Sequence, residues 1–194
     1  MLPHLPLRAH LAFCRHYSNT NLEIDNANIA YTITYAGGSC SVSAKAEVMM
    51  KKLIATRDDW MPLILRLTLG IVMLPHGLQK TFGMFGGQGF SATMDGMSHM
   101  FPSFLVFLAI VAEFAGALGL ITGFLTRIAA FGILCNMLVA IWKVHLTNGF
   151  FMNWMGKQPG EGIEYHLLVI GICIALMVYG GGKASIDKAI SKAS

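Results

Sequence analysis

Four stretches of the sequence are almost entirely apolar, and each is long enough to cross a lipid bilayer as a helix. They cover residues 62–82, 102–122, 128–147 and 163–181. A hydrocarbon core about 30 Å thick takes roughly 20 residues of helix at a rise of 1.5 Å per residue. The pattern therefore predicts an all-α membrane protein, a bundle of four transmembrane helices.

Composition agrees with this fold class. Hydrophobic residues make up 55% of the 194 residues and charged residues only 12%, whereas soluble proteins carry about 25% charged residues. A soluble fold of this length cannot hide four such apolar runs. The formal net charge is +4, but the basic residues lie at the ends of the apolar stretches and form no stripe with interleaved aromatic residues. This pattern argues against binding of nucleic acid.

The segment before the first apolar stretch has a different character. Residues 1–49 are polar and show no sustained period. A second start is available at Met49 or Met50, directly before two lysines. We therefore expect a membrane domain over residues 50–194, with the preceding segment either a disordered tail or the product of an upstream start. The alternative is a short cytoplasmic extension with a strand-like piece around residues 29–35.

The connections between the stretches differ in length. Residues 83–101 are rich in Gly, Met and Phe and contain no Lys or Arg. Within them, residues 90–100 have apolar side chains at helical spacing, which predicts a short helix lying flat on the membrane. Residues 123–127 are a tight connection, so the second and third spans form an antiparallel hairpin. Residues 148–162 form a second long loop.

The distribution of Lys and Arg predicts the orientation. One side of the membrane would hold Lys51, Lys52, Arg57, Arg127, Lys183, Lys188 and Lys192. The loops of the other side hold only Lys157, with Lys80 and Lys143 at helix ends. Because short basic segments stay on the cytoplasmic side, we expect both termini in the cytoplasm and both long loops outside.

Ionisable side chains interrupt the apolar stretches. They are Arg66, His76, Lys80, Glu113, Lys143, His145, Glu164 and His166. Such groups are costly in lipid, so they face one another or a wet interior and mark a functional site. In the predicted orientation most of them converge in the outer half of the bundle, and Arg66 lies in the inner part of the first span.

Glu113 is the most informative of these residues, because it lies midway along the second span. A carboxylate at this depth is protonated, paired or hydrated. We expect its partner to be Arg66 or His76 from the first span. It either takes part in the function or holds the helices together, and the sequence leaves both open.

The remaining ionisable residues have alternative interpretations. Lys80 and Lys143 either contribute to the site or extend to the lipid headgroups. Lys143 and His145 are two residues apart, about 200° around a helix, so only one of them faces the interior. The same holds for Glu164 and His166. We predict no metal site, because the histidines are not at helical ligand spacing.

The cysteines do not indicate thiol redox chemistry. They stand at positions 14, 40, 135 and 173 and form no CxxC pair, although thiol oxidoreductases need two close cysteines. We expect Cys135 and Cys173 to be small buried apolar side chains.

Three pieces of the membrane part carry a recognisable combination of motifs: RLTLGIVMLPHGLQKTFGMFGGQGF, EFAGALGLITGFLTRIAA and EYHLLVIGICIALMVYGGGKASID. Together they resemble the DoxX family of small bacterial membrane proteins. The family pattern has an early Arg and a Gly-x-x-Lys in the first span, Glu-Phe-x-Gly-Gly in the second, and a Gly-x-Gly-x-x-Ser-x-Asp tail. Here it falls on Arg66, Gly77, Lys80, Glu113, Phe114, Gly116, Gly180, Gly182, Ser185 and Asp187, with Ala117 replacing the second Gly of the second motif.

The resemblance implies a place in the bacterial cytoplasmic (inner) membrane and a link to quinol or thiosulfate–quinone oxidoreduction, or to complexes that handle oxidative stress. The sequence has no dinucleotide-binding glycine fingerprint, haem attachment motif or iron–sulfur cysteine set, so we expect no covalently bound cofactor. A redox role would then need quinone as a diffusible lipid cofactor, or an oxidoreductase partner subunit.

The leading hypothesis is a quinone-linked membrane component of an oxidoreductase or oxidative-stress system. Four residues would carry the chemistry: Arg66, His76, Glu113 and His166. Three would contact the quinone: Lys80, His145 and Glu164. The sequence leaves two alternatives open, a carrier or channel for a small solute and a non-catalytic assembly subunit. Four spans without an inverted repeat argue against a carrier, although a homo-oligomer would compensate.

Overall fold

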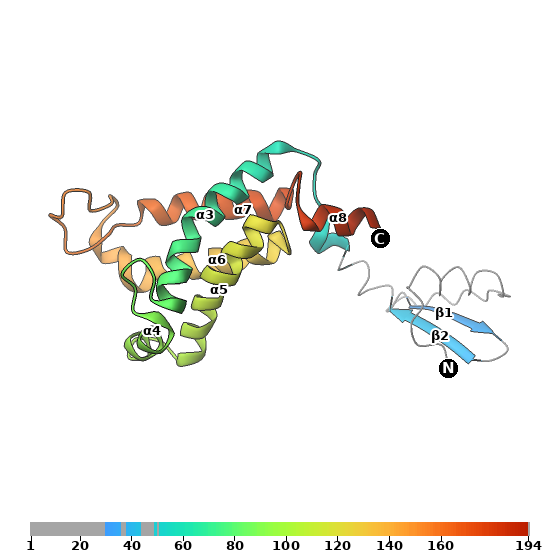
Figure 1. The fold of residues 1–194 in the computed structure, drawn as a ribbon, viewed down its shortest axis with the longest axis horizontal. Coiled ribbons are helices and arrows are strands. Elements are labelled where there is room, and N and C mark those ends of the chain that lie inside the picture. Colours follow the sequence, from blue (N-terminus) through green and yellow to red (C-terminus); the bar gives the residue numbers. More distant parts are fainter. Residues whose placement is uncertain (1–29, 36–37, 44–48, 50, 194) are drawn as a thin grey trace. The chain divides into compact units, whose positions relative to one another are not determined.

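The computed structural model describes residues 30–35, 38–43, 49 and 51–193, and the chain divides into two units, Met1–Lys52 and Leu53–Ser194 (Figure 1). In the first unit, β1 (Ala30–Tyr35) and β2 (Gly38–Ser43) form an antiparallel pair. The strand-like piece expected around residues 29–35 coincides with β1. Most of the segment for which we expect a disordered tail or an upstream start lies outside the described residues.

The described residues of the second unit form helices joined by loops, with no strand among them. It contains α3 (Trp60–Phe82), α4 (Gly89–Ser98), α5 (Ser103–Thr122), α6 (Thr126–Ala140), the π-helical η1 (Ile141–His145), the 3-10 helix η2 (Leu146–Asn148), α7 (Glu164–Tyr179) and α8 (Ile186–Ala193). Three continuous helical segments are long and apolar enough to cross a membrane: Trp60–Phe82, Ser103–Thr122 and Thr126–Asn148. The predicted all-α membrane bundle is confirmed.

The fourth apolar helix is shorter than predicted. The sequence indicates a span over residues 163–181, but α7 has 16 residues and ends at Tyr179. It ends there because Gly180 has a φ of 77°, outside the helical region. A helix of this length rises about 24 Å, somewhat less than the hydrocarbon thickness of about 30 Å.

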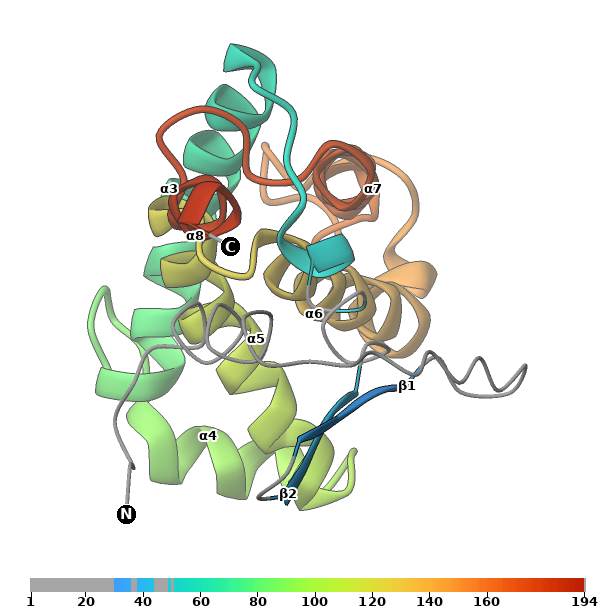
Figure 2. The same ribbon diagram turned by 90° about the vertical axis from the view of Figure 1, so that its right-hand side faces the viewer.

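The four apolar helices are arranged as two crossing pairs. α3 packs chiefly on α5, and α6 chiefly on α7, while α5 and α6 join the pairs through a tight turn. Figures 1 and 2 show the α6–α7 pair crossing the α3–α5 pair at a marked angle.

The two ends of the bundle differ in composition. We call the end where α3 begins and α7 ends the basic end, because Arg57, Arg127, Lys183 and Lys188 lie there. We call the opposite end the loop end, since it holds α4 and the loop of residues 149–163. α4 covers most of the short helix predicted over residues 90–100, contacts α3 and α5, and crosses below their ends in Figure 2.

Small residues allow α3 and α5 to touch. A Cβ atom added to Gly77 would lie 2.6 Å from the Cα of Phe114, so no larger residue fits there without moving a backbone. This contact sets α3 directly beside the middle of α5, where Glu113 lies. The close approach of the two helices therefore brings a charged residue of α3 near the Glu113 carboxylate.

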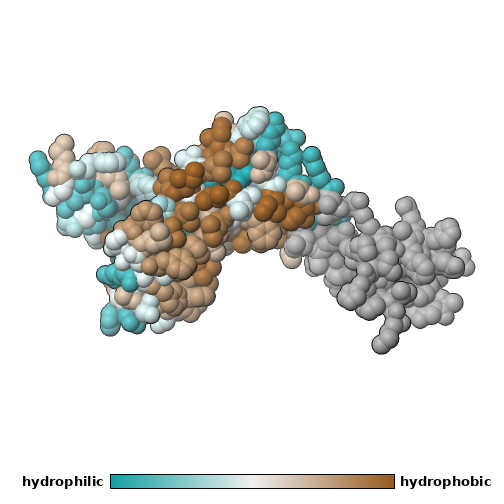
Figure 3. Space-filling model, viewed as in Figure 1, coloured by the Kyte–Doolittle hydropathy of each residue, from teal (hydrophilic) through white to brown (hydrophobic). Residues whose placement is uncertain are grey.

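A shared apolar core fills the bundle. Its buried members are Leu69, Met73, Ala117, Leu120, Ala130, Ile133, Met137, Val169, Cys173 and Leu176. Many other apolar side chains of the helices are exposed, and Figure 3 shows hydrophobic residues covering much of the helical surface, with hydrophilic ones toward the ends. This inverted distribution is that of a protein whose helices face lipid.

Candidate functional site

A buried ion pair occupies the middle of the bundle toward the loop end. Glu113 of α5 is 3% exposed. Its Oε1 atom lies 2.5 Å from Nζ of Lys80 on α3 and accepts a hydrogen bond of 2.7 Å from Nδ2 of Asn136 on α6. Three helices therefore meet at one carboxylate oxygen.

We expected the partner of Glu113 to be Arg66 or His76, and this prediction is wrong. The partner is Lys80. The physical reason is the direction of helical side chains, which lean toward the helix N-terminus. Lys80 lies near the end of α3 and extends back along it to the depth of Glu113. The Lys80 side chain is only 31% exposed and its ammonium contacts Glu113. It therefore does not extend to the lipid headgroups.

The second oxygen of Glu113 has a different environment. Its Oε2 atom is buried and has no hydrogen-bond partner among the residues that the structure describes. A buried carboxylate oxygen without a donor is costly unless it carries a proton or binds a ligand. Glu113 is thus held in place through one oxygen and left available through the other.

A row of aromatic rings lies beside this carboxylate. The ring of Tyr165 is 6.3 Å from that of His76 and 5.6 Å from that of His166, and the rings of His166 and His145 are 4.2 Å apart. The hydroxyl of Tyr165 donates to Sδ of Met73 on α3 at 3.3 Å. The Nδ1 atom of the buried His166 has no partner within the described part of the chain.

A π-helical segment helps to direct His145 toward this row. η1 covers Ile141–His145, and such turns often occur at functional sites. Nδ1 of His145 lies 2.8 Å from the carbonyl oxygen of Glu161, and because a carbonyl only accepts, Nδ1 carries the proton. Lys143 instead lies over the ring of Trp142 at 4.1 Å. As expected, only one of the two residues faces inward.

The carboxylate of Glu164 contacts the long loop of residues 149–163. Its Oε2 atom accepts a hydrogen bond of 3.1 Å from the backbone N–H of Met152 in the long loop. His166, two residues further along α7, is buried. Glu164 therefore anchors the loop, while His166 belongs to the ring row.

Arg66 lies at the basic end, apart from the other predicted site residues, and is 1% exposed. Its Nε donates to the carbonyl of Gly181 at 2.9 Å, and Nη1 donates to those of Leu120 and Ile121 at 3.0 and 2.5 Å. Nη2 donates to the carbonyls of Lys183 and Ala184 at 3.2 and 2.6 Å. All five N–H groups of a guanidinium are thus engaged, which leaves none for a ligand.

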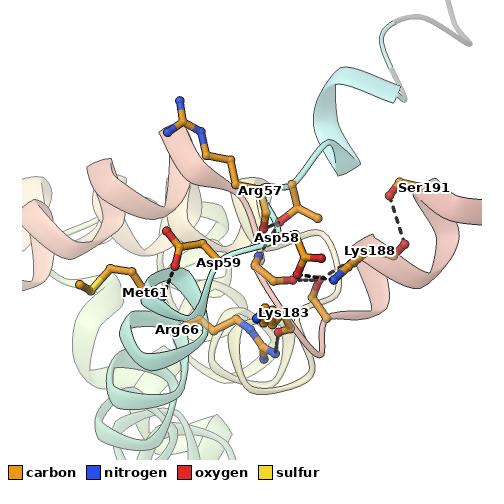
Figure 4. A network of polar contacts seen from close by, with 11 residues as sticks. Arg57, Asp58, Asp59, Met61, Arg66, Lys183, Lys188 and Ser191 are labelled. Atoms are coloured by element: carbon orange, nitrogen blue, oxygen red, sulfur yellow. Dashed lines mark hydrogen bonds and ion pairs between the residues drawn. The ribbon is translucent and has the colours of Figure 1, made fainter.

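Asp187 completes the same region. Its carboxylate accepts hydrogen bonds from the backbone N–H groups of Leu125 and Thr126, at 2.7 and 2.9 Å, and so caps the start of α6. A carboxylate at a helix N-terminus satisfies free N–H groups and complements the helix dipole. We call Arg66 and Asp187 together the clasp. Figure 4 shows Arg66 beside the turn that leads to α8, and the nearby pair of Lys188 and Asp58, 2.5 Å apart.

The structure therefore sorts the predicted site residues. It brings together His76, Lys80, Glu113, His145 and His166 at the loop end. It places Arg66 in the clasp, and it places Glu164, the first residue of α7, in contact with the long loop. Sequence reasoning missed Asn136, Tyr165 and the capping role of Asp187. Asn136 had a usable signal, because it and Glu113 both lie about ten residues, or about 15 Å, from the turn between α5 and α6.

The described residues contain no group of three or more His, Cys, Asp or Glu side chains that could hold a metal ion. Cys173 is buried and Cys135 half-buried, and both are free thiols. The chemical groups of the loop-end cluster are instead those that exchange protons and donate hydrogen bonds: one carboxylate, one ammonium, one phenol and imidazoles.

These features define a multi-pass helical membrane protein with a charged cluster inside its bundle. Residues 61–146 match the model of the DoxX family. The chain is also 28% identical over 143 residues to the inner membrane protein YqjF of Escherichia coli (strain K12), a match that covers 74% of this chain and 98% of that protein. Residues 61–146 of the membrane domain therefore carry a DoxX domain. No solved structure is significantly similar to it.

Proposed function

We propose that this protein resides in a bacterial inner membrane with both termini in the cytoplasm. The similarity to an inner membrane protein supports the location. The concentration of Lys and Arg at the basic end supports the orientation, because basic segments remain on the cytoplasmic side. A reporter fused after Ser194 should then be active in the cytoplasm, and one inserted at Gly160 should be active outside it. The reverse pattern would contradict the orientation.

We propose further that the protein is a quinone-linked membrane component of an oxidoreductase or oxidative-stress system. The observation that carries this proposal is the buried Oε2 atom of Glu113, which has no partner among the described residues, in a carboxylate paired with Lys80. A quinone site needs an apolar surrounding with a few proton-exchanging groups near the carbonyl oxygens. Glu113, Lys80, His76 and Tyr165 meet that requirement.

Each residue of the cluster has a distinct part in this proposal. Lys80 and Asn136 fix Glu113 through Oε1, so that Oε2 is the oxygen that binds and releases a proton. His166 and His145 continue the row toward the loop end, where His145 is half-buried and its ring can exchange a proton with solvent. His76 supplies a hydrogen bond to the polar head of the ligand, and the ring of Tyr165, whose hydroxyl donates to Sδ of Met73 at 3.3 Å, lines the site. Arg66 holds the helices in register and touches no ligand.

When bound, a quinone supplies two-electron redox chemistry with uptake of two protons. The electrons would come from a partner oxidoreductase subunit. This chain would provide the site in the membrane and the two protons. The exposed apolar surface of the helices is compatible with contact either to a second copy of the chain or to a different subunit.

Extraction of lipids from the purified full chain tests the proposal. We expect quinone to co-purify with the wild-type protein and to be lost from the Glu113→Gln variant, because Gln keeps the shape but cannot exchange a proton at that position. Asp95→Asn is the matched control, an acid-to-amide change at an exposed residue of α4, and should retain quinone. Wild-type protein free of quinone that moves a small solute in liposomes would instead support a carrier.

A further inference from the structure

The seams between neighbouring helices of the bundle are not equally closed. Gly70 and Gly77 bring α3 onto α5, and Gly116 brings α5 within 3.3 Å of Ile133 of α6, as measured from an added Cβ. α6 and α7 share most of the apolar core. α7 makes far fewer contacts with α3 than with α6. Figure 1 shows α3 and α7 diverging toward the loop end.

The loop-end half of this α3–α7 seam is where polar groups of the cluster reach the surface. His76 is exposed, Lys80 is partly exposed, and Tyr165 is half-buried across the seam from His76. Toward the basic end, the buried Met73 and Val169 belong to the shared core and close the seam. An imidazole exposed on an apolar span is unfavourable where it contacts only lipid. A polar group bound in the seam would give the His76 ring a hydrogen-bonding neighbour.

A second observation points to a ligand at the same place. Behind the seam, the Oε2 atom of Glu113 is buried and has no partner within the described residues. Lys80 connects the surface of the seam with the buried carboxylate, since its ammonium contacts Glu113 while part of its side chain is exposed. A headgroup lodged against the edges of the His76 and Tyr165 rings would therefore adjoin both the surface and the buried carboxylate.

We infer that the loop-end half of the α3–α7 seam is a lateral entrance, through which a lipid-soluble quinone places its headgroup beside Glu113 without leaving the bilayer. The inference rests on the proposed function and adds the route and the residues that line it. The headgroup oxygens accept hydrogen bonds from His76 and Lys80, while Tyr165, whose hydroxyl donates to Sδ of Met73, lines the entrance with its ring. The isoprenoid tail stays in lipid beside exposed apolar side chains such as Val72 and Leu168, because apolar surface is favoured there.

Photolabelling of the full chain in liposomes tests this route. The probe is an isoprenoid quinone with an azide on its ring, followed by mapping of the labelled peptides by mass spectrometry. We expect label on residues 72–80 of α3 and residues 164–169 of α7, and excess unmodified quinone should suppress it about tenfold. This readout requires no enzymatic activity.

Two variants of matched exposure sharpen the test. Val72 and Val139 are both 41% exposed, but Val72 lies one turn from His76 on the same face of α3, whereas Val139 lies on α6. Val72→Trp fills the seam and should reduce the competed label about tenfold. Val139→Trp should leave it unchanged. Equal effects of both variants would overturn the inference.

The remaining outcomes separate the route from the function. Label that quinone suppresses but that lies on α5 and α6 would overturn the lateral entrance and leave the proposed function standing. Label that excess phospholipid suppresses and quinone does not would overturn the inference in favour of a lipid headgroup site. Absence of any label that quinone suppresses would overturn the proposed function and the entrance together.

Discussion

The clasp at the basic end and the cluster at the loop end both place charge inside the bundle, but they satisfy it differently. In the clasp, five carbonyls surround the Arg66 guanidinium, and both oxygens of Asp187 accept backbone N–H groups. In the cluster, Lys80 and Asn136 share one oxygen of Glu113 while the other has no partner among the described residues.

This difference distinguishes a structural ion from one available for chemistry. A buried charge whose every hydrogen-bonding atom is engaged joins chain segments and cannot bind anything further. A buried charge with a free acceptor retains the capacity to bind a proton or a ligand. At the basic end, Thr126 Oγ1 and Arg127 Nε also have no partner in the described part of the chain, but Arg127 remains bound to Val178 through Nη2. Neither atom belongs to the clasp.

The largest expected effect comes from Arg66→Leu. It removes the donors of five carbonyls that belong to the end of α5 and to the turn before α8, and we expect a loss of about 3–5 kcal/mol of unfolding free energy. Thermal unfolding in detergent measures it. Arg127→Leu, which removes one carbonyl contact, should cost about 1 kcal/mol or less. Equal stability of Arg66→Leu and wild type would show that the clasp does not hold the bundle together.

Two changes at Glu113 should separate stability from function. Glu113→Leu leaves the partly buried ammonium of Lys80 and the amide of Asn136 without an acceptor, so we expect a loss of about 2 kcal/mol. Glu113→Gln keeps an acceptor and should cost less than about 1 kcal/mol, while it abolishes quinone retention. If Glu113→Gln destabilised the protein as strongly as Glu113→Leu, the cluster would serve stability, as the clasp does.

A smaller effect is expected at the cap of α6. Asp187→Ala removes both acceptors of the Leu125 and Thr126 N–H groups, which we expect to cost about 1–2 kcal/mol. Asp187→Asn keeps one acceptor and should lose about half of that. Hydrogen exchange of the first turn of α6, followed by mass spectrometry, locates the change. Exchange that is unaltered there in the Ala variant would contradict the capping role.

The smallest effect concerns the surface pair beside the clasp. The hydrogen bond from Lys188 lowers the pKa of Asp58 below its ordinary value. Because the folded-state pKa is lowered, the pair stabilises the protein above the unfolded pKa of about 3.9, and this contribution disappears as the pH falls through the folded value. The difference in Tm between wild type and Asp58→Asn should therefore be constant near neutral pH and shrink below about pH 4. A difference independent of pH would exclude the ion pair as its cause.

The sequence predicts the bundle well, because length and hydropathy alone decide that a helix spans a membrane. It also identifies Glu113 and Arg66 as buried charges. It does not reveal the partner of Glu113, since the rotation of α3 about its axis follows from the contact of Gly77 with Phe114. That contact joins residues far apart in the chain, and a single sequence does not display it.

The missed residues have a related explanation. Tyr165 at the start of an apolar helix is the ordinary position of an interfacial anchor, and Asn136 is uncharged, so neither interrupts the hydropathy pattern. Asp187 lies in a polar tail, where an acid has no special meaning until the start of α6 is known to lack a cap of its own. Both the ring row and the clasp depend on tertiary contacts.

The clasp also sets an order of events during biosynthesis. Ribosomes deliver α3, α5 and α6 to the membrane before residues 181–187 have been translated. Until then, the guanidinium of Arg66 lacks three of its five carbonyls, and the first N–H groups of α6 lack the carboxylate that caps them. A nascent or truncated product therefore carries unsatisfied polar groups within the bilayer. This gives membrane quality-control proteases a physical basis for telling an unfinished chain from a finished one.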